Sequence, residues 1–248
     1  MRPRVCILRT DGTNCDRETA FAFEICGARP DFVHVNELRS GLKRLTDYAL
    51  MAIPGGFSYG DDVLSGKILA VELISRLQDQ LQNFVAHGRP VLGICNGFQV
   101  LVRTGLLPYV RPGEISATLM GNDCGHFVCR WVTLKVEKGP CVFTAGMEGR
   151  TLSYQVAHAE GKFLAPEPLL DDIERRGLVV FRYNPYNPNG SLRAIAGICD
   201  PSGRVMGLMP HPERFVLPTQ HPNWRRGMAD EPHGLPIFAN AVRYAREM

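Results

Sequence analysis

Apolar residues in the first hundred positions form short runs that alternate with longer amphipathic stretches. The run YALMAI at 48–53 is apolar throughout, which is typical of a strand buried on both faces of a sheet. Similar runs predict a set of parallel strands at 4–8, 31–35, 48–53 and 90–94. The stretches between and after them predict helices over roughly 17–27, 67–87 and 97–105. Asp16 is expected to cap the first helix, and Gly105 to end the last.

The pattern changes in the second half of the chain, where apolar and polar residues alternate. HFVCRWVTLKVE at 126–137 alternates as an antiparallel strand does. Further short strands are predicted near 151–156, 178–183, 192–198 and 204–209. The Asn-Gly pair in NPNGS (187–191) is typical of a tight hairpin. FANAVRYARE at 238–247 predicts a closing helix.

Strands that alternate with helices predict an α/β fold with a right-handed, doubly wound sheet. We expect a flavodoxin-like open sheet, mostly parallel and flanked by helices, with antiparallel strands added by the second half. No repeat, low-complexity tract or linker divides the sequence, so a single domain over residues 1–248 is expected.

The composition of the chain mainly excludes classes of protein. Hydrophobic residues make up 45% of the 248 positions, enough for a full core, and the net charge is +3 with both signs well mixed. No basic run predicts nucleic-acid binding. The N-terminal apolar stretch is too short for a signal peptide, and nothing approaches the ~20 apolar residues of a membrane span. We therefore expect a cytoplasmic protein whose eight cysteines stay reduced.

One cysteine occupies an unusual place. In PVLGICNGFQVLVRTG (90–105), Cys95 lies where the fourth predicted strand meets a helix, with Gly93 before it and Gly97 after it. Such a turn exposes a nucleophile at the carboxyl end of a parallel strand, where α/β proteins place their sites. The helix N-terminus favours the thiolate, which is the nucleophilic form. The alternative is a buried cysteine in a glycine-rich turn.

A second segment offers a base. His211 follows the strand predicted at 204–209 and lies between Pro210 and Pro212, which restrict the backbone around it. Glu213 lies two residues on, on the same side of an extended segment, and can accept the other imidazole N–H. The three side chains would then supply a nucleophile, a base and a group that orients the base. An ordinary His-Pro loop is the alternative.

Main-chain N–H groups complete the predicted site. Gly55 and Gly56 follow the third strand, and without side chains their N–H groups can approach a substrate closely. The N–H of Asn96, at the start of the helix after Cys95, can donate to the same oxyanion. An ordinary Gly-Gly turn is the alternative for the first pair.

No metal or nucleotide site is expected in this chain. Cys124, His126 and Cys129 have the spacing C-x-H-x-x-C, but no second ligand pair accompanies them and the segment alternates like a strand. GDDVLSGKI (60–68) only superficially resembles a phosphate-binding loop. It has five residues between its glycines where four are needed, and isoleucine in place of Ser or Thr.

Three motifs together resemble the triad class of glutamine amidotransferases, also called class I. They are PGG (54–56), GICNGFQ (93–99) and PHPE (210–213), in the order and spacing of that class. Within it, the whole chain resembles the glutaminase subunits of phosphoribosylformylglycinamidine synthases. Further matching segments are GTNCDRET (12–19), PGGFSYGDDVLSG (54–66), VAHAEGKF (156–163), NPNGS (187–191) and IAGICDPSGRVMGLMPHPER (195–214).

The resemblance implies roles for the site residues. Cys95 would attack glutamine and form a γ-glutamyl thioester, with His211 as the base and Glu213 as its orienting partner. Main-chain N–H groups, including that of Asn96, would bind the oxyanion, and Gln99 would line the glutamine pocket. Gly56 would donate a second main-chain hydrogen bond to the oxyanion. His158 lies in one of the matching segments, but the resemblance implies no role for it.

The resemblance also implies partners. Ammonia would pass to a separate synthetase subunit, which uses ATP and magnesium to make formylglycinamidine ribonucleotide, and a small third subunit is expected. This chain would carry no cofactor of its own. The long polar segment 215–236 would either contact the partner or form a solvated loop.

Two other functions remain open at this point. A free-standing hydrolase of the same superfamily, acting on γ-glutamyl peptides, would need no partner. A flavodoxin-like binding module with an inert thiol would leave His211 and Glu213 unexplained.

The sequence also has Asp11 where the resembled family more often has proline.

Overall fold

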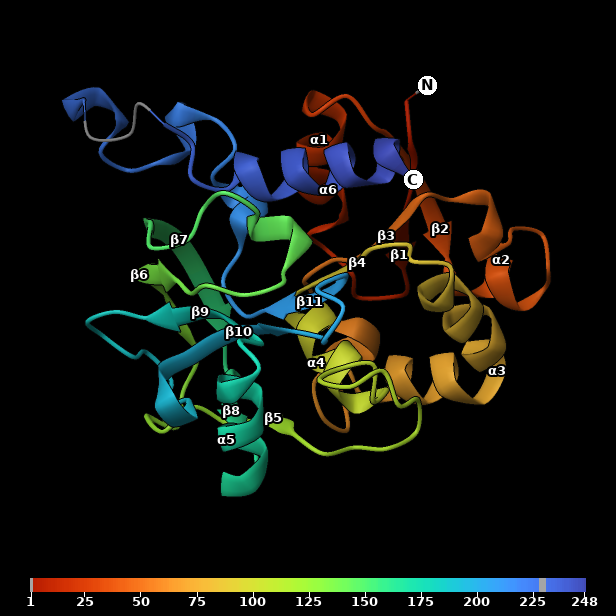
Figure 1. The fold of residues 1–248 in the computed structure, drawn as a ribbon, viewed down its shortest axis with the longest axis horizontal. Helices are drawn as coiled ribbons and strands as arrows, with labels where there is room; N and C mark the ends of the chain where they lie inside the picture. The colour runs from red at the N-terminus through yellow and green to blue at the C-terminus, as the bar shows by residue number, and fades with distance from the viewer. Residues whose placement is uncertain (1, 228–230) are drawn as a thin grey trace.

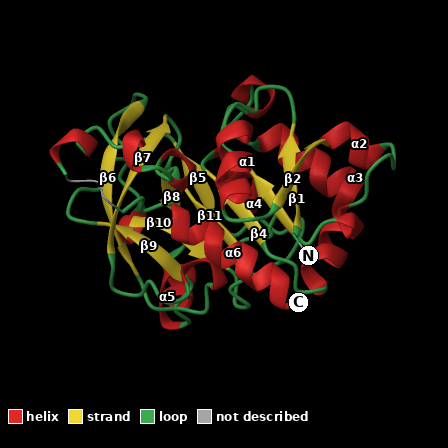
Figure 2. Ribbon diagram, turned by 90° about the horizontal axis from the view of Figure 1, so that it is seen from above, coloured by secondary structure: helices red, strands yellow, loops and turns green. Residues whose placement is uncertain are grey.

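The computed structural model describes residues 2–227 and 231–248. A mixed sheet of nine strands runs through it in the order β2-β1-β3-β4-β11-β10-β9-β6-β7 (Figures 1 and 2). These strands are β1 (Arg4–Arg9), β2 (Arg29–His34), β3 (Leu50–Ile53), β4 (Val91–Ile94), β6 (Val128–Val136), β7 (Thr151–His158), β9 (Val179–Tyr183), β10 (Ile195–Cys199) and β11 (Val205–Leu208). The half from β2 to β11 is parallel, and the half from β11 to β7 is antiparallel. The expected α/β fold with a parallel core and added antiparallel strands is confirmed.

Helices cover both faces of the parallel half (Figure 1). Helices α1 (Asp16–Ile25) and α6 (Leu235–Glu247) lie on one face, and α3 (Lys67–Ala86) and α4 (Asn96–Arg103) on the other. The short helix α2 (Val35–Arg39) follows β2 directly. Helix α5 (Glu167–Arg175) lies beside a small antiparallel pair, β5 (Thr118–Met120) and β8 (Lys162–Leu164). Within the described residues, the helices are too short or too polar to cross a membrane.

Apolar spacing explains these layers. Strands β3 and β4 are buried at every position, as the uninterrupted apolar runs predict. In α3, Leu69, Leu73, Leu77 and Leu81 recur every four residues and are all buried against the sheet side of the helix. Helices α1 and α6 meet through aromatic rings that cross edge to face, with 5.0 Å between ring centroids.

The prediction for the start of α1 was wrong. Cys15, not Asp16, is the N-cap residue, and its side chain makes no capping hydrogen bond. The Asp16 carboxylate instead lies 2.6 Å from Nε of Arg9 at the end of β1. The opposite charge of the guanidinium favours the ionised carboxylate, so this ion pair replaces the expected cap.

The tight hairpin predicted at 187–191 was also wrong. Strands β9 and β10 are antiparallel neighbours, but the whole segment 184–194 connects them. Inside that segment, Oδ1 of Asn187 accepts hydrogen bonds from the N–H groups of Asn189 and Gly190. The asparagine side chain therefore closes a local turn within a longer loop rather than a hairpin.

The order of the strands brings distant segments together. Strands β4 and β11 are parallel neighbours, so their carboxyl ends lie side by side although β4 ends at Ile94 and β11 begins only at Val205. The N–H of Cys95, just after β4, donates to the carbonyl of Leu208 at the end of β11, at 2.8 Å. The two segments predicted to carry the nucleophile and the base are therefore adjacent.

Candidate active site

Cys95 occupies a strained turn between β4 and α4. Its φ is +51° and its ψ is −103°, a conformation that few L-residues adopt. A Cβ added to Gly97 would lie 1.9 Å from the carbonyl oxygen of Ile53, and one added to Gly93 would lie 2.6 Å from that of Gly97. Both flanking positions therefore require glycine, because any side chain there would clash with neighbouring main-chain atoms. The turn places the Cys95 side chain at the carboxyl end of β4, as expected of a nucleophile.

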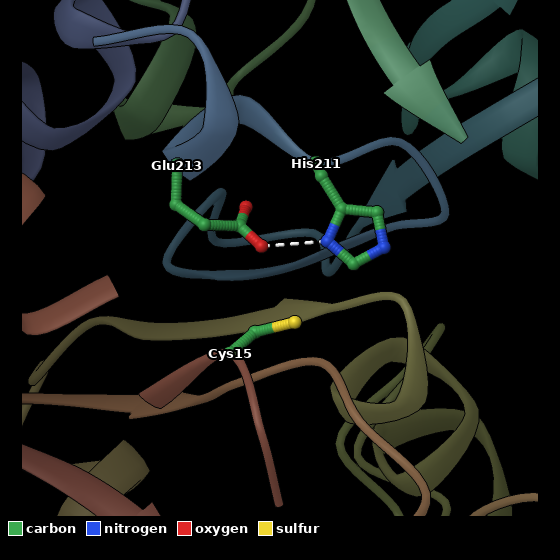
Figure 3. Close-up of side chains that lie close together, drawn as sticks. All are labelled: Cys15, His211 and Glu213. Carbon is green, nitrogen blue, oxygen red and sulfur yellow. Dashed lines mark hydrogen bonds and ion pairs between the residues drawn. The ribbon is translucent and has the colours of Figure 1, made fainter. Parts of the chain in front are cut away.

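His211 and Glu213 form a buried pair. Nδ1 of His211 lies 2.6 Å from Oε1 of Glu213, and both side chains are almost fully buried (Figure 3). The segment between them is a 3-10 turn over Pro212–Arg214, not the extended stretch that the sequence predicted. This turn carries the carboxylate back toward the imidazole. The N–H of His211 donates to the carbonyl of Gln155 at 2.8 Å, which anchors the pair to β7.

The surrounding charges favour the protonated form of the histidine. Burial by itself lowers the pKa of His211, but the charges of Glu213 and of a Cys95 thiolate raise it well above its ordinary value. Because Nδ1 faces Glu213, the nitrogen left for proton exchange is Nε2. Nε2 is buried and has no hydrogen-bond partner among the described residues. The arrangement suits a base that takes a proton from a thiol and later returns it.

The glycine loop contributes Gly56 to the wall of the site. An isolated antiparallel bridge joins Gly56 to Thr13 and uses the N–H of Phe57 and the carbonyl of Gly55. The N–H of Gly56 stays outside these hydrogen bonds. Gly56 has a φ of +142°, and an added Cβ would lie 2.7 Å from the amide nitrogen of Asn14. Only glycine fits this position.

Asn96 and Gln99 use their side chains to hold loops. Oδ1 of Asn96 accepts a hydrogen bond from the N–H of Ser58, and its Nδ2 donates to Asp61 and to Oε1 of Gln99. Nε2 of Gln99 donates to the carbonyl of Glu160 at 2.6 Å. The backbone N–H of Asn96 starts α4, where helical N–H groups have no intrahelical acceptor. That N–H can donate to a substrate, while the predicted substrate contact of Gln99 stays a prediction.

A cavity of about 240 Å³ connects these groups. It is lined by Asn14, Cys15, Gly56, Phe57, Cys95, Phe127, Ala157, His211 and Arg214. Of the predicted site residues, the structure therefore brings Gly56, Cys95 and His211 to one cavity. Gly55 and Glu213 lie just behind this wall, since a Cβ on Gly55 would come 2.8 Å from Cε1 of His211. A larger apolar groove of about 420 Å³ beside β5 and β8 contains none of the predicted residues.

Several residues of the cavity were missed by sequence reasoning. Cys15 is almost fully buried, and its Sγ accepts a hydrogen bond from Nη2 of Arg214 at 3.2 Å. The rings of Phe57 and Phe127, both partly exposed, stack with 6.5 Å between their centroids. A signal for Cys15 was present, because it directly precedes the first helix just as Cys95 directly precedes α4. Arg214 and Phe127 reach the cavity by tertiary packing alone.

His158 lies at the end of β7 and is buried inside the protein. It is 3% exposed, and its Nδ1 lies 3.1 Å from Oδ1 of Asn122. Burial, together with the smaller effect of the nearby His211 charge, lowers the pKa of His158 to about 4. Because Asn122 Oδ1 only accepts hydrogen bonds, the histidine is held neutral with its proton on Nδ1.

This neutral histidine predicts a loss of stability in mild acid. The unfolded chain takes up a proton near pH 6.5, whereas folded His158 does so only near pH 4, so stability falls as the pH drops between these values. The full loss is about 3 kcal/mol at or below pH 4. The free energy of unfolding should be measured by urea denaturation of the wild type and of His158→Gln between pH 4 and 7. The variant should show the shallower pH dependence, and parallel curves would contradict the assignment.

The remaining sequence candidates lie outside the cavity. In segment 215–236, the rings of Phe215 and His221 pack against Trp131 of β6, so its first part is not a solvated loop. Trp224 farther along is 43% exposed beside Arg225, and residues 228–230 lie outside the described part of the chain. In the described chain, the possible metal ligands Cys124, His126 and Cys129 form no cluster close enough to hold an ion.

Comparisons with known proteins agree with this geometry. Residues 2–245 match the family described as the CobB/CobQ-like glutamine amidotransferase domain. The chain is 46% identical to phosphoribosylformylglycinamidine synthase subunit PurQ of Dehalococcoides mccartyi, over 98% of this chain and 97% of that protein. It is 40% identical to the subunit of the same name from Thermus thermophilus, over 97% and 98% of the two chains.

Solved structures give the same result. A chain in the structure of PurLQS from Thermotoga maritima is 34% identical, with a TM-score of 0.80 over 98% of this chain and 99% of that chain. The glutaminase domain of a Trypanosoma brucei CTPS, solved with bound acivicin, shares 15% identity at a TM-score of 0.60 and shows the common fold. The chain therefore belongs to the PurQ family, the glutamine amidotransferase subunits of phosphoribosylformylglycinamidine synthase.

Proposed function

We propose that this chain hydrolyses glutamine on Cys95 and supplies the ammonia to a synthetase that makes formylglycinamidine ribonucleotide. The observation that carries the proposal is the meeting of Cys95 with the His211–Glu213 pair in one cavity, at the ends of neighbouring parallel strands. Membership of the PurQ family supports the choice of substrate and of acceptor.

The first step is attack on the side-chain amide of glutamine. The reactive state is the pair in which Nε2 of His211 has already taken the proton of Cys95, and the thiolate sulfur forms a bond to the amide carbon. The electron pair of the C=O double bond moves onto oxygen. The N–H groups of Gly56 and Asn96 donate hydrogen bonds to this oxyanion, which stabilise the transition state more than the substrate.

The second step releases ammonia. The tetrahedral intermediate collapses, the C–N bond breaks, and Nε2 of His211 gives its proton to the leaving nitrogen. A γ-glutamyl thioester remains on Cys95. Water then attacks the thioester while His211 accepts its proton, the C–S bond breaks, and the thiolate regains a proton as glutamate leaves. Glu213 stays ionised and holds the imidazole in one tautomer.

The remaining parts of the reaction belong to partners. The Thermotoga maritima structure is of PurLQS, a name that adds two components to PurQ, and we propose the same assembly for this chain. ATP and magnesium are assigned to the synthetase, since this chain offers no phosphate-binding loop. We place the enzyme in the cytoplasm, where the eight free cysteines would remain reduced.

The test is to measure glutamate release from glutamine by the purified chain, first alone and then with the cognate synthetase, small subunit, ATP and formylglycinamide ribonucleotide. We expect slow release by the chain alone, because uncoupled hydrolysis wastes glutamine, and at least ~10-fold faster release in the full mixture. Fast release by the chain alone, unchanged by the mixture, would point to a free-standing hydrolase. Omitting only the acceptor nucleotide is the matched control.

A further inference from the structure

A second thiol stands beside the buried histidine–glutamate pair. Cys15 Sγ, a ring nitrogen of His211 and a carboxylate oxygen of Glu213 all lie within 4.8 Å of one another (Figure 3). The proposed glutamine chemistry uses His211 and Glu213 but has no role for Cys15. We propose that Cys15, His211 and Glu213 form an inhibitory binding site for Zn²⁺ or a similar thiophilic divalent cation. This inference goes beyond the proposed function, and its central test needs no catalysis.

The donor set suits zinc. Thiolate, imidazole and carboxylate are the three side-chain ligand types that zinc prefers, and its bonds to them are about 2.0–2.3 Å long. Tetrahedral ligand atoms are then about 3.3–3.6 Å apart. Nδ1 of His211 and Oε1 of Glu213 are now 2.6 Å apart and must open slightly, while the Cys15 sulfur must move inward. These shifts are of the order of 1 Å or less, within what side-chain rotation provides.

An unpartnered atom points independently to a ligand. Oε2 of Glu213 is buried and makes no hydrogen bond within the described chain. Buried polar atoms without partners are rare and costly, and a bound ion is one way for a protein to satisfy them. Oε2 would allow the carboxylate to bind a cation with both oxygens. Gly55 contributes space, because any Cβ there would lie 3.2 Å from the Cys15 sulfur.

The charges balance when the ion replaces protons. In the resting site, protonated His211 and ionised Glu213 sum to zero beside a neutral Cys15 thiol. Zinc binding at Nδ1 would remove one proton from His211 and one from Cys15, which leaves one dication, two anions and a neutral imidazole. The sum is again zero, so the buried site gains no uncompensated charge. Two protons are released for each ion bound.

Arg214 lies close to this site and has two effects. Its Nη2 donates to the Cys15 sulfur at 3.2 Å, and a metal-bound thiolate keeps this hydrogen bond as an outer-shell contact. Its positive charge opposes a second cation nearby. The guanidinium is partly exposed in the cavity wall, so it can turn toward solvent and away from the bound cation.

The expected effect is inhibition without contact to the nucleophile. A zinc ion on Nδ1 leaves the His211 proton on Nε2, the nitrogen that faces the substrate side. The imidazole can then no longer accept the proton of Cys95, and the first step of hydrolysis stops. Removal of the ion by a chelator restores the base.

The test is a competition titration of the full-length purified chain with Zn²⁺ against a chromogenic chelator, supported by the absorption spectrum with Co²⁺. We expect one ion per chain and a thiolate-to-cobalt charge-transfer band. Cys15→Ala should weaken binding by at least ~100-fold, since loss of even an outer-shell partner costs 10–100-fold. Cys15→Ser, which preserves the volume of the side chain, gives the same comparison if the alanine variant does not fold.

Two control variants separate this site from ordinary thiol binding. Cys95→Ala removes the nucleophile of the same cavity and should still bind one ion, although it cannot turn over glutamine. Cys124→Ala removes an exposed thiol elsewhere and should bind like the wild type. Equal binding by Cys15→Ala and wild type, or loss of binding in Cys95→Ala, would overturn the proposed ligands. Binding of less than one ion per wild-type chain would overturn the site itself.

Discussion

Replacing Cys95 with alanine is expected to abolish glutamine-dependent synthesis while leaving ammonia-dependent synthesis intact. In the proposed mechanism the Cys95 sulfur is the protein atom that bonds to the substrate, so the loss should be about 10⁴-fold or more. The acceptor nucleotide and ATP are assigned to the synthetase, which can use free ammonia without the thioester. Product formation by the reconstituted complex should be measured with saturating glutamine and, separately, with an ammonium salt.

A matched variant makes this result interpretable. Cys124→Ala also removes a thiol, but that thiol is exposed and lies outside the cavity, so both activities should stay near wild type. If Cys95→Ala lost both activities, the cysteine would be needed for assembly or folding rather than for chemistry. If it kept the glutamine-dependent activity, another nucleophile would have to be sought.

Replacing Glu213 with glutamine is expected to lower kcat/KM for glutamine by about 10³–10⁴-fold. The uncharged amide can donate to Nδ1 of His211 and so stabilise the wrong tautomer, with the proton on Nε2. Loss of the carboxylate charge also lowers the pKa of His211, which Glu213 helps to raise. His211 of the variant therefore loses its proton at a lower pH than His211 of the wild type.

The pH profile distinguishes this effect from simple damage. Glutamate release should be followed from pH 6 to 10 for the wild type and for Glu213→Gln. We expect the alkaline limb of kcat/KM to move to lower pH in the variant. Glu114→Gln, at an exposed carboxylate that pairs with Arg111, should behave like the wild type. An alkaline limb that stays in place would mean that Glu213 does not tune the histidine.

The parts of the fold with strong local patterns were predictable. The apolar runs of β3 and β4, the glycine-flanked turn at Cys95 and the proline-framed His211 each depend on residues close in sequence. Helix α5 shows a missed signal, because Glu167–Arg175 has Pro168 near its start, Gly177 after its end and buried Leu170 and Ile173 three residues apart. It was overlooked because its apolar stripe is narrow and its charged residues are many.

The parts that depend on tertiary packing were not predictable. Asp16 pairs with Arg9 instead of capping α1, and nothing in the local sequence decides between these partners. The meeting of Cys15 with His211 and Arg214 depends on the loops that follow β1 and β11, whose carboxyl ends lie at the same end of the parallel half of the sheet although β3 and β4 separate the two strands. The prediction that His211 and Glu213 would form a pair is confirmed by their hydrogen bond, but the 3-10 turn that joins them was not foreseen.

The position of β11 has a consequence for how the protein is made. This strand is synthesised after every other strand of the sheet, yet it lies in the middle of the sheet, between β4 and β10. Until it arrives, the edge of β4 remains unpaired and open to association with other nascent chains. The thiol of Cys95 is then present without His211, the base that we propose for it. A chain interrupted before β11 is therefore both unable to close its sheet and chemically silent, so unfinished copies do not consume glutamine.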